Sequence, residues 1–425
     1  MVDAGKRVTT AAIAGAEANA AVRQVLRALS TLLRQRDFRV VVSCSTVLGL
    51  AASFVMPFMS MFSTLAVGMS LGIFGAFMTL TALANVAIST ALANRSDAHY
   101  SRRAMLLLGS GSGALGYLGY AAARSPWQLM LIGSLVLGVA SITFSQLFAY
   151  SRELLERSEL PAADAPLYMN AIRMSFALSW TVGPALASAA LRAFSFTGLF
   201  LCAASLYLAF FAIVLRFVPA TTRATRSRAR SDELGALALF RDRSLLSWFV
   251  AFVLILAAHT ISMSNMSLFV LKELGGNASH VGVIFSLAPI FELPLMLYFG
   301  LLATRIETGK LIRVAMVLAV LYYTALSCVR APYQIYPLQL LSAAIVSVTS
   351  GIAITFFQNK LPDRLGAATN LYSNASRVGS TSAYLLFASS ASYFGHRATY
   401  VLCAALALVS LVLSGAGERY FPAKT

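Results

Sequence analysis

One carboxylate lies in the middle of a long apolar segment. Glu292 occurs in the sequence PIFELP, near the centre of the segment 281–303. A charge at the centre of a bilayer costs about 2.5–3.5 kcal/mol on insertion scales, and an acidic side chain at that depth reaches neither surface. We therefore expect Glu292 to face water or substrate in a cavity, where it takes up a proton or binds a substrate hydroxyl. The alternative is an interhelical pair that only positions the helices.

Two arginines form a second group of candidates. Arg173 and Arg377 each lie about two turns inside an apolar segment, where a long side chain can snorkel to the membrane surface. Each also belongs to a polar stripe at helical spacing. Asn170, Arg173 and Trp180 share one face. Asn374 and Arg377 share another. Two such stripes favour helices that line a cavity over a pair of snorkelling arginines.

Three amides and a histidine add further candidates. Gln146 and Gln358 lie near the ends of two other apolar segments, and a carboxamide can both donate to and accept from a hydroxyl. A role at the helix end explains them nearly as well. His259, near the middle of its segment, could carry a proton, although packing in the core is the more ordinary role. Asn265, further along, is a candidate for substrate contact.

The sequence does not support an enzymatic reaction. Its four histidines are scattered over different segments, and neither HExxH nor GxxxxGK[ST] occurs, which argues against metal-dependent hydrolysis and ATP-driven transport. The four cysteines lack the spacing of a metal site or a disulfide framework. We therefore expect no enzyme activity, no bound metal and no cofactor.

The elements that position these residues are long apolar helices. Of the 425 residues, 58% are hydrophobic and 12% are charged, and the stretches 40–94 and 244–271 contain no charged residue. A helix needs roughly 20 apolar residues to cross the hydrocarbon, and these runs lack the alternation of barrel strands. We predict an all-α membrane protein with twelve transmembrane helices. The predicted spans are 40–62, 71–93, 104–123, 128–150, 167–191, 194–218, 245–270, 281–303, 311–330, 333–358, 367–391 and 394–415.

The net charge of +17 follows this topology. With the amino terminus in the cytoplasm, most of the 33 Lys and Arg fall in the tails, the central linker and the cytoplasmic loops. The opposite side carries only Arg124, Arg192, Lys272, Arg330 and Arg397. This asymmetry is the positive-inside pattern, so we predict cytoplasmic termini and no nucleic-acid partner.

Several motifs occur twice, separated by about 204–212 residues. LYMNAIR at 167–173 matches LYSNASR at 371–377, LANR at 92–95 matches LATR at 302–305, and Gln146 matches Gln358. We predict two halves of six helices in parallel orientation. The predicted divisions are a basic amino-terminal segment 1–37, a first bundle 38–218, a cytoplasmic linker 219–243, a second bundle 244–415 and a tail 416–425.

The amino-terminal segment 1–37 does not have the pattern of a signal peptide, because further arginines precede the first long apolar stretch. Its leucines and arginines fall on different helical faces, which predicts a basic helix on the inner membrane surface. A disordered positive tail is the alternative.

The loop after the second predicted span carries a compact group of charges. It reads LANRSDAHYSRR over 92–103. We expect Asp97 to accept hydrogen bonds from the end of a neighbouring helix. Arg102 and Arg103 would pair with acidic groups of the facing bundle, so that the loop latches one conformation. The alternative is a short basic loop on the inner side.

Segments in both halves resemble the bacterial sugar efflux transporter family within the major facilitators. They are RSD at 95–97, SQLFAYSRE at 145–153, Arg173 with WTVGP at 180–184, ELP at 292–294 and FQNKLPDRLGAAT at 357–369. The resemblance covers most of the chain from about residue 38. The loop alone would identify only the superfamily.

This resemblance implies a major facilitator fold of two six-helix bundles in a bacterial cytoplasmic (inner) membrane. It also implies export of sugars or glycosides by proton antiport. By motif match it assigns functional weight to Gln146, Arg173, Trp180, Glu292 and Gln358. Asn265 stands where the family leads us to expect an acid, and Arg377 where we expect an uncharged residue.

Our leading hypothesis is a proton-coupled exporter of small saccharides or glycosides that works by alternating access. Its partners would be the substrate and the membrane lipids, and a monomer would suffice. A second hypothesis, with the same fold, is an exporter of drugs or metabolites, which a cavity rich in Met and Phe would favour. A third is a membrane sensor that binds without transporting.

Overall fold

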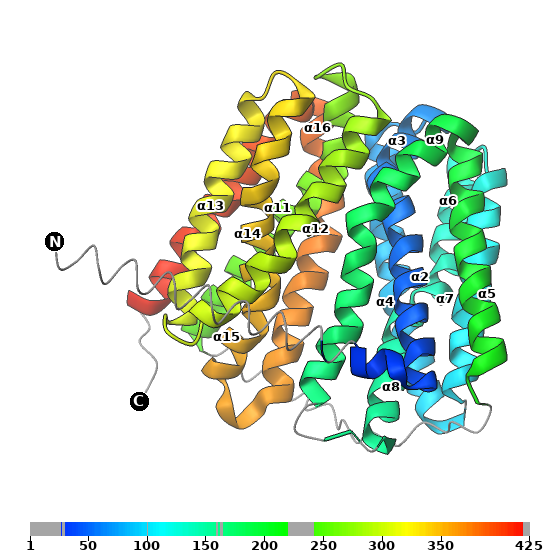
Figure 1. Cartoon of the computed structure of the whole chain (residues 1–425). Helices are drawn as coiled ribbons and strands as arrows, with labels where there is room; N and C mark the ends of the chain where they lie inside the picture. Colours follow the sequence, from blue (N-terminus) through cyan, green and yellow to red (C-terminus); the bar gives the residue numbers. More distant parts are fainter. Residues whose placement is uncertain are drawn as a thin grey trace. The chain divides into compact units, whose positions relative to one another are not determined.

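The regular structure of the chain is helical. The computed structural model describes residue 27 and residues 30–99, 101–158, 160–161, 165–219 and 242–419. Within these ranges there is no β-strand (Figure 1). The predicted all-α fold is therefore confirmed. The predicted surface helix, the linker and the carboxy-terminal tail lie largely outside the described residues.

The first half of the chain contains four long helices, α2, α4, α5 and α9, and several shorter ones. In chain order they are α2 (Arg36–Val55), α3 (Met59–Met61), α4 (Leu71–His99), α5 (Arg102–Ala122), α6 (Pro126–Leu131), α7 (Leu137–Ala140), α8 (Ile142–Arg157) and α9 (Ala165–Phe217). The second half follows the same plan. Its helices are α11 (Arg243–Lys272), α12 (Ala278–Leu302), α13 (Thr308–Cys328), α14 (Ile335–Gly351), α15 (Ala353–Lys360) and α16 (Leu365–Arg419).

The described residues form two compact units. We call them the amino-terminal unit, with residues 27–69 and 80–219, and the carboxy-terminal unit, with residues 70–79 and 242–419. The first turns of α4 pack within the carboxy-terminal unit, where the ring centroids of Phe74 and Phe387 lie 6.0 Å apart. The predicted first bundle, 38–218, includes all of α4. The compact units of the structure instead assign residues 70–79, with the first turns of this helix, to the carboxy-terminal unit.

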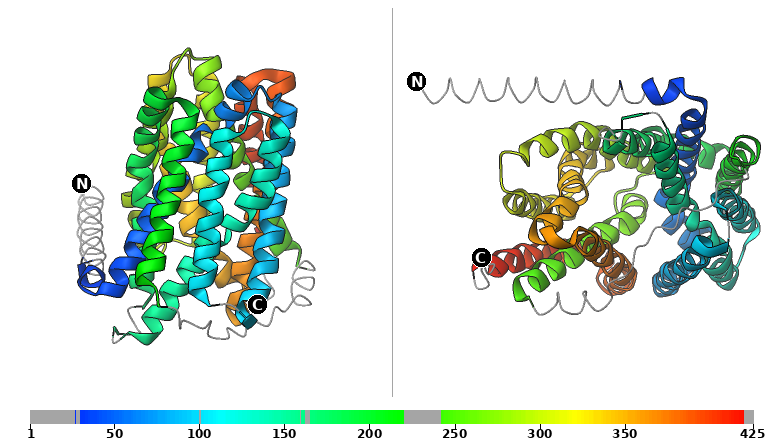
Figure 2. Two further views of the ribbon diagram at one scale, coloured as in Figure 1. Left: turned by 90° about the vertical axis from the view of Figure 1, so that its right-hand side faces the viewer. Right: turned by 90° about the horizontal axis from the view of Figure 1, so that it is seen from below.

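The same helix pairs pack together in both halves. α2 and α5 both pack against α9, and α11 and α13 both pack against α16. Seen along their axes, the helices within each unit run roughly parallel or antiparallel to one another (Figure 2). Repeated pairing of this kind is what an internal duplication predicts.

Small residues permit close helix contacts inside each unit. Gly183 of α9 lies against Ser53 of α2, where a Cβ atom would collide with the Ser53 hydroxyl. A Cβ atom at Gly379 of α16 would lie 2.6 Å from the carbonyl oxygen of Val253 on α11. In a membrane, close backbone approach increases the van der Waals contact that holds helices together.

Nine helical segments of the described chain are long and apolar enough to cross a membrane. Two of them, Leu167–Phe217 and Gly366–Gly415, are about twice the length that a bilayer requires. Each is interrupted near the predicted break between two spans. Ser195 interrupts α9 with a φ of 60°, and Gly395 interrupts α16 with a φ of 84°. Each of these two helices is one of the nine segments, although its interruption divides it into two lengths.

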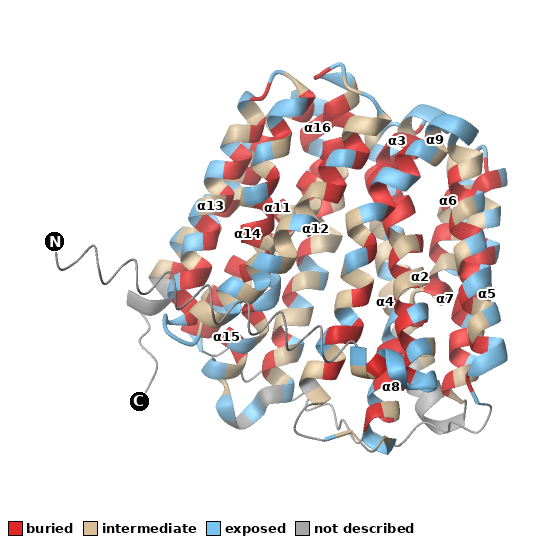
Figure 3. Cartoon of the chain, viewed as in Figure 1, coloured by how far each residue is buried: buried red, intermediate tan, exposed pale blue. Residues whose placement is uncertain are grey.

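The outward faces of the helices are apolar. Leu115 on α5 and Leu321 on α13 are 66% and 55% exposed, and exposed positions recur along both helices (Figure 3). Soluble monomers rarely leave extended apolar faces in contact with water. Apolar faces of this kind belong against lipid, where the helical backbone satisfies its own hydrogen bonds.

Candidate functional site

Glu292 lies half-buried near the middle of α12, between two prolines of the same helix. Pro289 and Pro294 lack an N–H, so each leaves a helical carbonyl without its usual partner. The Ser347 hydroxyl of α14 donates to the backbone oxygen of Glu292 at 3.2 Å, which fixes the position of this turn. Among the described residues, the Glu292 carboxylate has no ion-pair partner. The recorded contact of Glu292 with α14 is therefore through its backbone oxygen.

The polar stripe of α16 is present in the carboxy-terminal unit. Asn374 and Arg377 are both exposed on this helix. Gln358, at the end of α15, donates from Nε2 to the Thr369 hydroxyl at 3.2 Å. Its amide thus binds a hydroxyl, but the hydroxyl belongs to the protein. The geometry of Gln358 supports the helix-end role at least as well as substrate contact.

Asn265 has a different environment from the other candidates. Its side chain is fully buried on α11, and its Nδ2 donates to the His396 carbonyl at 2.8 Å. The His396 Nδ1 atom lies 2.7 Å from Asn265 Oδ1. Both ends of the amide are therefore occupied, and Asn265 fastens α11 to the residue after the Gly395 interruption. This geometry does not favour the predicted substrate contact.

The side chains of His259 and His396 differ in their hydrogen bonding. His259 is half-buried on α11, and its imidazole makes no hydrogen bond in the part of the chain that the structure describes. His396 is 6% exposed and bonds to Asn265. His396 was not among the residues chosen from the sequence, because its partner is distant along the chain. The available signal was a histidine at the start of the long apolar segment 394–415.

The amino-terminal unit places Arg173 beside a group of phenylalanines. The Arg173 guanidinium carbon lies 5.7 Å from the centroid of the Phe148 ring. The ring centroids of Phe148 and Phe144 lie 4.7 Å apart, and those of Phe144 and Phe176 lie 5.2 Å apart. Arg173 is exposed and has no ion-pair partner among the described residues, so a cation–π contact is its recorded interaction.

Asn170 and Trp180 extend this face of α9. Asn170 is exposed and Trp180 is half-buried, and both lie on the helix that carries Arg173. The helix therefore presents an amide, a guanidinium and an indole at helical spacing. These groups can hydrogen-bond hydroxyls and pack against the apolar face of a ring.

Gln146 belongs to a buried polar cluster with two charged residues. Arg102 Nε lies 2.9 Å from Glu153 Oε1, and Arg102 Nη1 donates to Gln146 Oε1 at 2.9 Å. Gln146 and Glu153 lie two helical turns apart on α8, so both reach the same guanidinium from one face. We call Arg102, Gln146 and Glu153 the Arg102 cluster. Glu153 was missed in the sequence, although its spacing from Gln146 was a usable signal.

The two arginines of the predicted latch have partners within the amino-terminal unit. Arg102 pairs with Glu153 inside its own unit. Arg103 donates from Nη2 to the Leu215 carbonyl at 2.6 Å, also within the amino-terminal unit. The Asp97 side chain lies outside the described part of α4. The two arginines therefore bind α5 to α8 and α9, because these helices are the neighbours that their positions reach.

The described residues contain no group of three or more His, Cys, Asp or Glu side chains arranged to hold a metal ion.

Comparisons with known proteins place the chain among membrane transporters. The family profile described as Major Facilitator Superfamily matches residues 41–366. A putative sugar efflux transporter of Deinococcus radiodurans is 35% identical, with 85% of this chain and 93% of the relative covered. Sugar efflux transporter A of Escherichia coli is 28% identical over 86% of this chain and 92% of the relative.

Solved structures agree on the fold. A crystal structure of the nucleoside transporter NupG is similar with a TM-score of 0.74 and 16% identity, and the match covers 92% of this chain and all of that one. A bacterial homologue of the lysosomal transporter Spinster gives a TM-score of 0.75 at 10% identity, over 93% of this chain and 98% of the other. At these identities the similarity concerns the fold alone.

Proposed function

This chain belongs to the sugar efflux transporter family of the major facilitator superfamily, and from that premise we propose that it exports small saccharides or glycosides by proton antiport with alternating access. It is a multi-pass membrane protein and a transporter, not an enzyme. The observation that carries the substrate class is the 35% identity to a relative named as a putative sugar efflux transporter over most of both chains.

The proposed architecture has twelve membrane passes in two bundles of six. Dividing α9 at Ser195 and α16 at Gly395 gives two spans from each of these helices. α5, with 21 residues, is long enough to cross although it is not among the nine apolar segments. The matching contacts of α2, α5 and α9 with those of α11, α13 and α16 support six helices in each half.

The proposed topology places both termini in the cytoplasm of a bacterium. The distribution of Lys and Arg supports this orientation through the positive-inside rule. We propose a monomer that works in the lipid of the cytoplasmic membrane, because one chain carries both halves of the repeat.

The proposed coupling residue is Glu292. It is an acid in the middle of a membrane-spanning helix, without an ion-pair partner among the described residues. An unpaired carboxylate in that position is costly, and protonation removes the charge. A cycle in which Glu292 must lose its proton on one side and regain it on the other would link transport to the proton gradient.

We propose saccharide contacts in each unit, taken separately. In the amino-terminal unit, Asn170 and Arg173 can hydrogen-bond hydroxyls, and Trp180 can pack against a sugar ring. In the carboxy-terminal unit, the exposed Asn374 and Arg377 supply a further amide and guanidinium. Gln146, Gln358 and Asn265 are secondary in this proposal, since each is already hydrogen-bonded within the protein.

Counterflow in proteoliposomes tests the substrate class. Vesicles loaded with a panel of sugars, alkyl glycosides and cationic drugs are diluted into labelled lactose, and uptake of label is followed. Exchange driven by saccharides alone is the expected result. Exchange driven by drugs and not by sugars would refute the saccharide proposal while leaving the family assignment intact.

Drug export is the second candidate. A protein named Multidrug resistance protein MdtG, from Enterobacter lignolyticus, is 22% identical over 87% of this chain and 89% of the relative. The higher identity to the sugar efflux relatives favours saccharides. The same counterflow panel separates the two candidates.

Coupling is tested with Glu292→Gln. This variant keeps the size and the hydrogen-bonding atoms of the side chain but cannot exchange a proton. We expect it to retain counterflow and to lose at least about tenfold in transport driven by a proton gradient, as for loss of an essential proton carrier. Glu156→Gln is the matched control, because Glu156 lies exposed in a surface ion pair with Arg152. Unchanged gradient-driven transport in the Glu292 variant would remove Glu292 from the coupling mechanism.

A further inference from the structure

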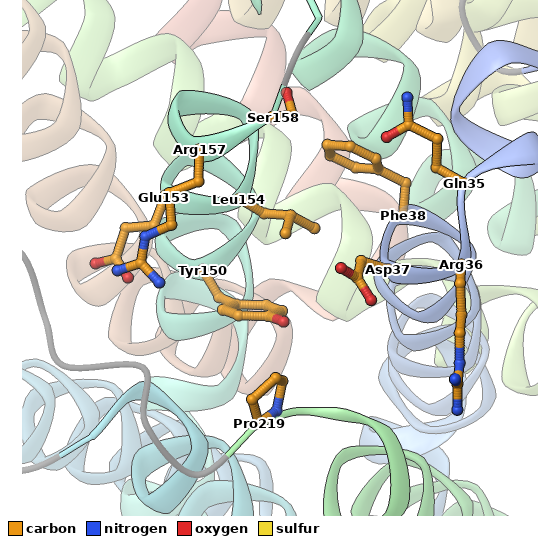
Figure 4. A pocket seen from close by; sticks show the side chains of 10 residues that line it. All are labelled: Gln35, Arg36, Asp37, Phe38, Tyr150, Glu153, Leu154, Arg157, Ser158 and Pro219. Carbon is orange, nitrogen blue, oxygen red and sulfur yellow. The ribbon is translucent and has the colours of Figure 1, made fainter.

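A pocket of about 480 Å³ lies at one end of the amino-terminal unit. Its walls come from the start of α2, the last turns of α8 and the segment that follows α9 (Figure 4). None of the residues proposed to contact substrate or carry the proton lines it. Its volume falls within the range of about 300–1,000 Å³ that small-molecule sites occupy. The pocket is therefore a second concave site, separate from the proposed transport residues.

One polar atom of a pocket-lining residue has no hydrogen-bond partner in the described structure. Glu153 lines it and is 7% exposed, and its Oε2 atom is buried without a hydrogen-bond partner in the described structure. The Oε1 atom of the same carboxylate is bound by Arg102. A buried acceptor without a partner costs about 1–3 kcal/mol. Oε2 is enclosed by the protein in the described structure, so Glu153 contributes to the wall of the pocket and does not supply a free acceptor.

Other groups around the pocket can donate as well as accept. The Asp37 carboxylate and the Tyr150 hydroxyl are directed towards each other across the space between α2 and α8 (Figure 4). Arg157 follows Glu153 by one turn and has no ion-pair partner among the described residues. The Phe38 ring extends between the same two helices (Figure 4). Acceptors, donors and an aromatic face therefore surround one space.

The charges around the pocket balance. The Arg36 guanidinium lies 5.8 Å from the centroid of the Phe217 ring and points away from the other labelled side chains (Figure 4). Glu153 is neutralised by Arg102, which leaves Asp37 and Arg157 as one charge of each sign. A strongly cationic or anionic ligand gains little net attraction in such surroundings.

We propose that this pocket binds a neutral polyhydroxylated small molecule, a saccharide or polyol, at a site separate from the transport path. A hydroxyl group both donates and accepts, so one ligand can donate to the Asp37 carboxylate and accept from the Arg157 guanidinium. The Phe38 and Tyr150 rings supply the flat apolar surface against which the C–H face of a sugar packs. The site lies at the end of the unit that we place in the cytoplasm, where it would respond to the internal concentration of such a solute. The proposal goes beyond the transport function and does not depend on turnover.

Thiol protection in the full-length protein tests the site. Ser158 lies on the pocket wall, and Ser158→Cys introduces a thiol of nearly the same size there. Cys328 is a naturally exposed thiol on α13 of the other unit and serves as the internal control in the same sample. Maleimide labelling of the two sites is followed by peptide mass spectrometry. The probes are lactose, glucose, glycerol and myo-inositol, with choline and inorganic phosphate as charged probes.

We expect at least one neutral probe to slow labelling at position 158 by about tenfold when its concentration is about ten times its Kd. Labelling of Cys328 should not change. Protection should persist with Glu292→Gln, which acts on transport, and should disappear with Asp37→Asn combined with Arg157→Gln. Retained protection alongside failed counterflow would separate this site from the transport proposal.

Three results would overturn the inference. The first is no protection by any neutral probe. The second is protection by choline or phosphate alone, which would assign the pocket to a charged ligand. The third is protection that survives the substitutions at Asp37 and Arg157, since those residues would then play no part in binding.

Discussion

Replacing Glu153 by leucine removes the acidic partner of a buried guanidinium, and the consequence can be worked out from the Arg102 cluster. The two side chains are 8% and 9% exposed, and their closest nitrogen and oxygen lie 2.9 Å apart. Removing one partner of a buried ion pair costs about 3–5 kcal/mol, because the remaining charge is left uncompensated. Arg102 keeps its hydrogen bond to Gln146, so we expect Glu153→Leu to lower the free energy of unfolding by about 3 kcal/mol, the lower end of that range.

A variant with both residues replaced shows whether Arg102 and Glu153 stabilise the protein as a pair or independently. Arg102→Met alone strands the Glu153 carboxylate and should cost a similar amount. Arg102→Met combined with Glu153→Leu removes both charges and leaves apolar side chains in their place. We therefore expect the double variant to lose less than the sum of the two single losses, with a coupling energy of at least about 2 kcal/mol.

The assay is reversible unfolding in mixed micelles titrated with SDS, with the free energy of unfolding measured for all four proteins. Arg152 and Glu156 provide the matched cycle on the same helix, because their side chains are 77% and 55% exposed. Solvent screens that pair, so its coupling should stay below about 0.5 kcal/mol. If the losses at Arg102 and Glu153 add to within about 0.5 kcal/mol, the two charges are independent and the reasoning is refuted.

Two further variants test packing and buried hydrogen bonds by the same unfolding assay. Gly183→Ala should lower the free energy of unfolding by about 1–3 kcal/mol, because its new methyl group collides with α2, whereas Gly300→Ala, with no atom within 4 Å of the new Cβ, should be neutral or slightly stabilising. Equal effects of the two substitutions would contradict the close approach at Gly183. Asn265→Leu should lose about 1–3 kcal/mol, because it leaves the buried His396 without its partner. A stability unchanged from the parent would show that this hydrogen-bonded pair contributes nothing.

The helices were predictable because a membrane span depends on the residues of one continuous apolar segment. Ser195 and Gly395 interrupt α9 and α16 close to the breaks predicted between spans. A span depends on about 20 consecutive residues and on the thickness of the bilayer, both of which can be read from the sequence. Gly395 also suits its conformation, since glycine adopts positive φ without a steric penalty.

The side-chain partners were less predictable because they depend on how helices rotate about their axes. Arg102 and Glu153 are separated by 51 residues, and Asn265 and His396 by 131. The sequence identified Arg102 as part of a charged loop and Asn265 as a polar residue within a span. It did not reveal which acid Arg102 would meet, or that the Asn265 amide would be used up within the protein. To predict such partners, one must know how two different helices are placed and rotated relative to each other.

The partners divide the polar residues of the spans into two groups with different consequences. Arg102, Gln146 and Asn265 have their hydrogen-bonding groups bound by other parts of the same unit, so their cost of burial is offset in the resting protein. Glu292, Arg173 and Arg377 have no ion-pair partner among the described residues. A charge that the protein leaves uncompensated must be stabilised by water, by a proton or by a ligand. Substitutions in the first group should therefore lower stability more than transport, and isosteric substitutions in the second should do the reverse. A transport defect without loss of stability at Glu292, set beside a stability defect at Arg102, is the pattern that this division requires.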